Sequence, residues 1–169
     1  MARMVSNATH LIYLAKIGKL YLIKSVFKEV AIPEEVRREV VDRGKARGEK
    51  DAYIIEKAIN AGWIKVYEIE KLELPIKLDA GETAALSLAK KLHKDVLIDE
   101  ISARTAAEII GLTPRGTVFV LLKALEMKEL NFEEFLETLA RLIQEGFRLR
   151  EDVYIEAVEI AEKIQRDKK

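Results

Sequence analysis

The short apolar run from Val96 to Ile98 restricts what this chain can fold into more than any other feature. Its length and β-branched content are typical of a central parallel strand, and the next segment, EISARTAAEIIG, has the apolar spacing of a helix that ends at Gly111. A buried strand that passes directly into a helix predicts an open α/β sheet, and ligands bind such sheets outside the carboxyl ends of the strands. Asp99 lies at this transition. It can bind a ligand there, or it can cap the following helix by accepting a backbone N–H.

The same alternation of strand and helix extends back to the N-terminus. Further strands are expected at residues 4–6, 29–33 and 63–69. Helices are expected on both sides of a break near Gly18, from Pro33 onward, at 52–62 and at 78–93. The last of these helices has a strong entry signal, because Asp79 can be its N-cap and Glu82 the reciprocal capping-box residue.

Beyond residue 116 the pattern is helical only. Helices are expected at 118–128, capped by Thr117, and at 131–146 and 150–166. The fold class is therefore α/β, with a mainly parallel central sheet flanked by helices. Residues 1–130 would form the α/β domain, and residues 131–169 a helical C-terminal extension packed on the same domain.

Composition removes several classes of function. The 29 basic and 29 acidic residues cancel, so any contact with nucleic acid must be local. The absence of Cys excludes disulfides, thiol nucleophiles and zinc fingers, and two His do not make an imidazole-rich metal site. No apolar segment has the length of a membrane span and the N-terminus lacks a signal-peptide core, so a cytoplasmic protein is expected. The wealth of Lys and Glu with few amides is typical of thermophiles.

Oxygen ligands remain at the predicted strand ends and helix starts. There is no Gly-rich phosphate loop and no nucleophile elbow. The candidates are Asn7, Glu39, Glu82 and Asp99, with Thr9 and Glu100 nearby. Carboxylates of this kind suit Mg²⁺ or Mn²⁺, which can activate water for attack on a phosphodiester. The ordinary explanations are helix capping for Glu82 and a solvated helix face for Glu39.

Two expectations follow from clustered carboxylates. Their mutual repulsion should raise the pKa of at least one of them. Asp99→Asn should then keep or gain stability in metal-free buffer while losing metal-dependent cleavage.

A basic segment and two single residues have competing interpretations. Residues 42–51, with two Gly and four cations, are expected to form a mobile loop. Its cations can grip phosphates or simply be solvated; they are Arg43, Lys45, Arg47 and Lys50. His10 is expected to be a packing or capping residue, and Trp63 a core residue.

Four segments, in order along nearly the whole chain, resemble the PIN-domain family, in particular its archaeal and bacterial subfamily of predicted nucleases. These are VSNATHLIYLAKIGKLYLI, IPEEVRREV, LDAGETAALSLA and VLIDEISARTAAEIIGLTPRGTVFVLLKAL, with GFRLREDVY resembling the C-terminal segment of the subfamily. The resemblance implies a PIN-like three-layer fold with an acidic pocket that binds magnesium or manganese ions and cuts single-stranded RNA. It also implies a toxin held by an antitoxin protein.

Carried over by position, the members of that pocket are Asn7, Glu39, Glu82 and Asp99. Thr9 would be the neighbouring hydroxyl, Glu100 an assisting acid, and Arg104 a brace for the acids. The chain departs from the family at Asn7, where PIN nucleases usually have Asp.

The expected function is therefore a metal-dependent ribonuclease of PIN type. The rival is a catalytically weak PIN-like protein that binds nucleic acid or serves as a scaffold. A third interpretation is a structural domain whose acids are all caps. The apolar surface of residues 117–128 and of the last two helices further predicts a homodimer or a partner helix.

Overall fold

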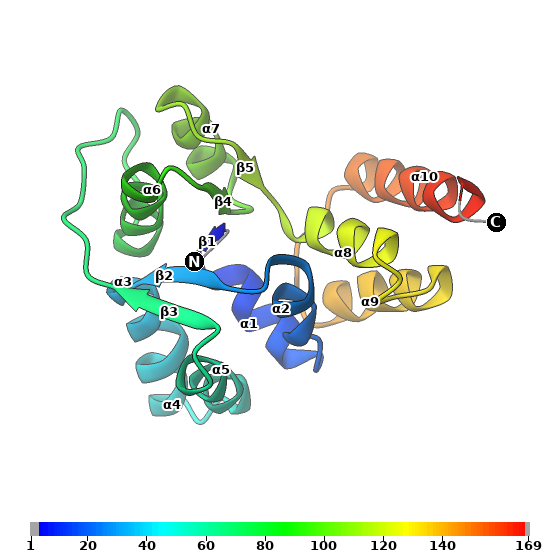
Figure 1. Ribbon diagram of the computed structural model, residues 1–169, viewed down its shortest axis with the longest axis horizontal. Helices are drawn as coiled ribbons and strands as arrows, with labels where there is room; N and C mark the ends of the chain where they lie inside the picture. The colour runs from blue at the N-terminus through cyan, green and yellow to red at the C-terminus, as the bar shows by residue number, and fades with distance from the viewer. Residues whose placement is uncertain (1–3, 168–169) are drawn as a thin grey trace.

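A parallel five-stranded sheet forms the centre of the protein in the computed structural model, which describes residues 4–167 (Figure 1). The strand order is β3-β2-β1-β4-β5, and every paired strand runs parallel to its neighbour. The bounds are β1 Met4–Ser6, β2 Val30–Pro33, β3 Ile64–Tyr67, β4 Asp95–Leu97 and β5 Pro114–Arg115. The prediction of an α/β fold with a mainly parallel sheet is confirmed. Strand β5 was not expected, because its two residues lie in a Pro- and Gly-containing segment that locally favours a loop.

Alternate residues of each strand enter two separate apolar clusters, which makes the fold three-layered. Val5 and Val96 belong to the cluster under α6 (Ala80–Leu92) and α7 (Ile101–Ile109). Met4 and Leu97 belong to the cluster on the other face. That cluster includes residues of α1 (Ala8–Lys16), α2 (Tyr21–Phe27) and α5 (Lys50–Asn60). Because side chains of a strand alternate between faces, the central strands β1 and β2, which are buried throughout, show that both faces of the sheet are covered there.

The segment after β2 is helical as far as Ala46, where a mobile loop was expected at residues 42–51, and residues 47–49 form the turn before α5. Helix α3 (Glu34–Arg37) continues into the π-helix η1 (Arg38–Arg43), and the short α4 (Gly44–Ala46) follows. A methyl group at Gly44 would lie 2.7 Å from Cβ of Ala52, so glycine is needed there for close packing of α4 on α5. A glycine that serves packing was therefore misinterpreted as a loop signal. Pro33 is the N-cap of α3 and not its first helical residue.

The C-terminal part consists of α8 (Thr117–Glu126), α9 (Phe132–Gln144) and α10 (Glu151–Asp167), which contact one another (Figure 1). Phe135 and Ala161 from these helices lie in the same buried cluster as Leu11 and Leu14 of α1. The division into an α/β domain of residues 1–130 and a helical extension of residues 131–169 stays a prediction. Within residues 4–167 no helix has the length and apolar character needed to cross a membrane.

Candidate functional site

The strands β1 and β4 bring Asn7 and Asp99 to one edge of the sheet. Ser6 pairs with Leu97 in the parallel register, and the Asn7 N–H donates to the Leu97 carbonyl oxygen at 3.0 Å. The two strands are therefore neighbours in the sheet. Asp99 follows two residues after Leu97, so both polar residues lie at the carboxyl ends of neighbouring strands, where ligands of such sheets bind.

Three side-chain oxygens surround Gly81 in the first turn of α6. A methyl group at this position would lie 3.6 Å from Oδ1 of Asp79, 3.6 Å from Oε2 of Glu39 and 3.8 Å from Oδ1 of Asn7. Asn7 follows β1, Glu39 belongs to η1 and Asp79 caps α6, so the three oxygens come from separate parts of the chain. We refer to Asn7, Glu39 and Asp79 as the Gly81 group.

The acids at this edge are desolvated and repel one another. Burial raises the pKa of Glu39, and the adjacent Asp79 carboxylate raises it further, while Arg43 and Arg47 act in the opposite direction. Burial also raises the pKa of Glu82 to about 7. The expectation that at least one carboxyl has a raised pKa agrees with both shifts. A cation at this edge would replace the proton that the raised pKa values favour.

Glu82 also has the capping role that was expected of it. Its backbone N–H donates to Oδ1 of Asp79 at 2.7 Å, and its Oε1 accepts the Asp79 N–H at 3.2 Å. The capping box is therefore complete. Oε2 takes no part in it, so capping and a role at the site are compatible for this residue.

Asp99 is held by Thr117 and His10. Its Oδ1 accepts the Thr117 N–H at 3.1 Å, and its Oδ2 accepts the Thr117 hydroxyl at 2.8 Å and lies 3.0 Å from Nδ1 of His10. Arg104 lies beside them, since a methyl group at Gly116 would be 2.8 Å from Oδ1 of Asp99 and 3.3 Å from Nη1 of Arg104. We refer to His10, Asp99, Arg104 and Thr117 as the Gly116 group.

These contacts correct two capping assignments. Asp99 does not cap α7, whose N-cap is Glu100 without a side-chain cap bond. Instead it accepts from the first residue of α8, and the N-cap of that helix is Gly116 and not Thr117. A carboxylate at the positive end of a helix dipole is stabilised there. Asp99 therefore fixes the position of α8 relative to β4.

The environment of Asp99 favours its charged form. Burial alone would raise its pKa, but His10 and the hydrogen bonds from Thr117 hold the pKa of Asp99 below its ordinary value. Three of the roughly four acceptor positions of a carboxylate are filled by these contacts. Oδ1 keeps the remaining one, and the side chain is 25% exposed.

Sequence reasoning missed two residues of the site, His10 and Asp79. His10 is fully buried, as expected of a packing residue, but its Nδ1 also contacts Asp99 and Thr117. Its Nε2 has no hydrogen-bond partner among residues 4–167. Asp79 was assigned only as a cap. A signal for both was present, because His10 lies one helical turn after Asn7, and Asp79 one turn before Glu82.

The other predicted site residues lie at the border of these groups. The Arg104 Nη1 donates to the Ile98 carbonyl oxygen at 3.1 Å and so also secures the turn after β4. Thr9 is half-buried in the first turn of α1, and Glu100 is exposed at the start of α7.

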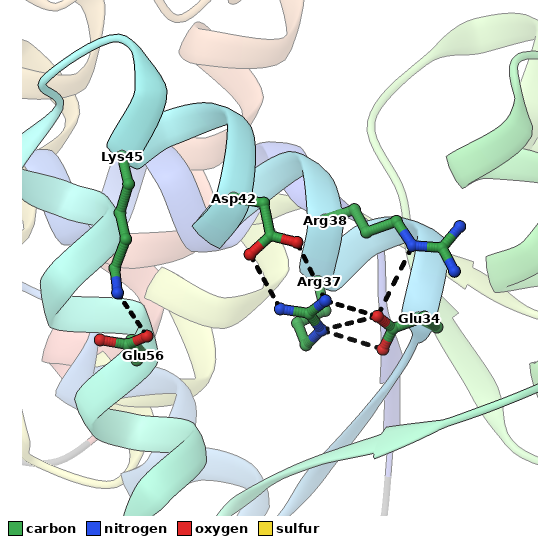
Figure 2. Close-up of polar contacts among 6 residues, drawn as sticks. All are labelled: Glu34, Arg37, Arg38, Asp42, Lys45 and Glu56. Atoms are coloured by element: carbon green, nitrogen blue, oxygen red, sulfur yellow. Dashed lines mark hydrogen bonds and ion pairs between the residues drawn. The ribbon is translucent and has the colours of Figure 1, made fainter.

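The predicted basic segment lies on the outer side of η1, α4 and α5. Figure 2 shows Arg37 between Glu34 and Asp42, and Lys45 bound to Glu56 with 2.6 Å between Nζ and Oε2. The charge of Lys45 is thus paired within the chain. Arg43, Arg47 and Lys50 are exposed.

The donor chemistry of the Gly81 group fits a hard divalent cation. No set of three or more His, Asp or Glu side chains within residues 4–167 is grouped closely enough to hold an ion. The Gly81 group, however, offers two carboxylates and one amide oxygen. Mg²⁺ commonly binds through one or two carboxylates and keeps several waters, so this set suits it.

A large open groove begins beside the Gly116 group. It has a volume of about 1290 Å³ and lies between α7, the start of α8 and the segment 143–153. Thr9, Asp99 and Glu100 line it, whereas Asn7, Glu39 and Glu82 do not. Asp99 is thus accessible from the groove.

One comparison with known proteins identifies a family. A family model described as PIN domain matches residues 3–163 of the chain. No curated protein and no solved structure matches it significantly.

Proposed function

Because the chain belongs to the PIN-domain family, a nuclease superfamily, we propose that it is a magnesium- or manganese-dependent ribonuclease that cuts single-stranded RNA. The observation that carries the proposal is the convergence of Asn7, Glu39 and Asp79 on Gly81 at the carboxyl edge of a parallel sheet. A phosphodiester brought to this edge would meet oxygen ligands for a cation together with acids whose pKa values are raised.

Each residue of the site has a defined part in this proposal. Asn7, Glu39 and Asp79 would hold the cation through oxygen atoms, and Asp99 would add the free position of its Oδ1. When bound, the ion supplies the Lewis acidity needed for attack of water on phosphorus. Glu82, whose pKa is raised to about 7, would accept the proton of the attacking water, since a base is most effective when its pKa lies near the working pH. As the P–O bond to the leaving oxygen breaks, the same carboxylic acid would return that proton to the leaving oxygen, so that the carboxylate is regenerated.

The supporting residues keep these groups in place. Thr117 and His10 fix the Asp99 carboxylate, and Arg104 secures the turn that follows β4. Thr9 and Glu100 would border the scissile phosphate, because both line the groove next to Asp99.

The test is cleavage of a fluorescently labelled single-stranded RNA with Mn²⁺ or Mg²⁺, compared with a chelator. Glu39→Gln should abolish most of the metal-dependent cleavage, because it removes one of the two carboxylates of the Gly81 group. Glu137→Gln is the matched control, since it makes the same change on an exposed position of α9. Equal cleavage by the Glu39 and Glu137 variants would contradict the proposal.

A second candidate function is favoured by Asn7 and by the absence of a three-carboxylate group within residues 4–167. It is a catalytically weak PIN-like protein that binds nucleic acid or serves as a scaffold. RNA binding without metal-dependent cleavage would establish this function in place of the first.

We also propose that the protein is a toxin held by an antitoxin and that it forms a homodimer. The support is exposed apolar surface on the C-terminal helix α10, where Ile155 is 56% and Ile160 39% exposed. Light scattering that shows a strict monomer at micromolar concentration, with no protein co-purifying from the native host, would contradict both.

A further inference from the structure

The groove beside Asp99 combines arginines with exposed isoleucines and half-buried aromatic side chains. We propose that this groove binds a single strand of nucleic acid, with its arginines on the phosphates and its apolar floor against the bases. The proposal rests on the proposed function, because Asp99, Thr9 and Glu100 of the proposed site line this groove.

Four arginines line the groove, and three of them lie beyond the turn that holds Asp99. They are Arg104, Arg115, Arg148 and Arg150. The acids of the lining are Asp99 and Glu100, which belong to the proposed site, and Glu108. Apart from the site itself, the groove therefore carries an excess of positive charge.

These arginines keep donors free for a ligand. Arg148 makes no ion pair within the described residues 4–167, and Arg150 contacts only the exposed Asp152, at 3.4 Å between Nε and Oδ1. An exposed pair of that kind is worth little in water and gives way readily to another anion. Arg115 differs from them, because its buried Nε makes no hydrogen bond and forms an ion pair with Asp95 at 3.8 Å from Oδ2.

The floor of the groove suits unstacked bases. The guanidinium carbon of Arg115 lies 4.6 Å from the centroid of the half-buried Phe119 ring, which also stacks on Phe27 at 6.5 Å, so the guanidinium of Arg115 covers the ring on the groove side. Ile101 is 66% exposed and Ile143 44% exposed, and they come from α7 and α9 on opposite sides. A duplex hides its base faces, whereas a single strand can place them on such side chains.

The groove has an advantage over the basic segment 43–50 as the nucleic-acid contact. Asp99 opens directly into the groove, whereas Lys45 of the basic segment is already paired with Glu56. If the groove binds the strand, substitution of its arginines should weaken binding, whereas if the basic segment binds it, substitution of Arg43 and Arg47 should do so. One binding experiment therefore distinguishes the two.

The experiment measures fluorescence anisotropy of a labelled single-stranded RNA in a chelator, where binding is seen without cleavage. The variants are Arg148→Ala with Arg150→Ala, and Arg43→Ala with Arg47→Ala. The matched control is Arg141→Ala with Arg166→Ala, which removes the same charge from exposed positions outside the groove. Single-stranded DNA and duplex RNA of the same sequence are the comparison ligands.

The groove variant, Arg148→Ala with Arg150→Ala, should bind single-stranded RNA roughly tenfold more weakly at about 0.1 M salt. The slope of log affinity against log salt concentration should decrease in magnitude by about 1.4, the value for two lost phosphate contacts on a single strand. Equal losses for RNA and DNA indicate recognition of backbone and base faces, and a larger loss for RNA indicates contact with the 2′-hydroxyl. Either result supports the groove.

Three results would overturn the proposal that the groove binds the strand. They are equal RNA affinity of the groove variant and the control, a loss of affinity confined to the Arg43 and Arg47 variant, and tighter binding of duplex RNA than of single-stranded RNA. Failure of the protein to cleave RNA would refute the proposed nuclease alone, since this binding is measured without metal.

Discussion

Nδ1 of His10 lies 3.0 Å from Oδ2 of Asp99, inside a protein whose only other histidine, His93, is exposed at the end of α6. The same nitrogen lies 2.9 Å from the Thr117 hydroxyl, which donates to Asp99. A donor role for Nδ1 is consistent with both contacts, because Oδ2 can only accept when Asp99 is ionised. The first helix, the end of β4 and the start of α8 are thereby joined through one carboxylate.

Asp99→Asn should therefore destabilise the protein by about 1 to 3 kcal/mol in metal-free buffer, in addition to reducing cleavage. This reverses the direction expected from the sequence. An amide has one acceptor oxygen in place of two, and it turns an NH₂ group toward donors. Chemical unfolding in a chelator measures the effect, with the exposed Asp152→Asn as control. Unchanged or increased stability would show that the contacts of Asp99 do not stabilise the fold.

The contribution of His10 can be separated by a double-mutant cycle. His10→Phe keeps an aromatic ring in the buried space but removes Nδ1. If the two side chains interact as the structure shows, the combined His10→Phe and Asp99→Asn variant should be more stable than the sum of the single effects by roughly 0.5 to 3 kcal/mol. Additive effects on the free energy of unfolding would mean that the contact between His10 and Asp99 does not stabilise the protein.

Two glycines of the site should respond differently to alanine. At Gly116 the new methyl would lie 2.8 Å from Asp99, so Gly116→Ala should cost about 1 to 3 kcal/mol of stability. At Gly81 the nearest atoms are 3.6 Å away, and alanine favours the helix by up to about 1 kcal/mol. Gly81→Ala should therefore keep the fold intact.

The methyl of Gly81→Ala would nevertheless occupy the space between the three oxygens of the Gly81 group. Manganese affinity, measured by calorimetric titration, should then fall while thermal stability is unchanged or higher. Unaltered manganese affinity in a folded Gly81→Ala protein would place the ion elsewhere.

Asn7→Asp should tighten manganese binding. The added charge interacts strongly with a divalent ion, but desolvation and repulsion offset most of this, leaving roughly 1 to 3 kcal/mol, or about 10- to 100-fold in affinity. Cleavage should rise, and stability without metal should fall, because another charge joins Glu39 and Asp79. Calorimetry and a cleavage assay on both proteins measure these changes. Unchanged affinity would favour the scaffold function.

The raised pKa of Glu82 makes metal-free stability depend on pH. A carboxyl with a higher pKa in the folded state stabilises the fold below its unfolded pKa, and this stabilisation is lost as pH rises through the folded value. Between about pH 4.5 and pH 7 the protein should lose this part of its stability. Glu82→Gln retains a capping oxygen without a titrating group, so its stability should decline less over the same window. Parallel pH profiles of the two proteins would contradict the prediction.

Local patterns were enough to predict much of the sheet and the helix starts, because these depend on neighbours in sequence. The capping box of Asp79 and Glu82, for example, spans three residues and was recognised from them. The role of His10 could not be read in this way, since its partner Thr117 is 107 residues away. The cap that Asp99 provides for α8 spans 18 residues and likewise depends on how β4 and α8 pack.

The π-helical turn that carries Glu39 makes the number of residues in this segment matter as well as their identity. A π turn accommodates one residue more than an α turn, and each residue of an α-helix advances by about 100°. A deletion that converted η1 to a regular α-helix would rotate Glu39 away from Asn7 and Asp79 without changing any of the three side chains. A one-residue deletion within Arg38–Arg43 should thus separate Glu39 from Asn7 and Asp79 in a protein that is still folded.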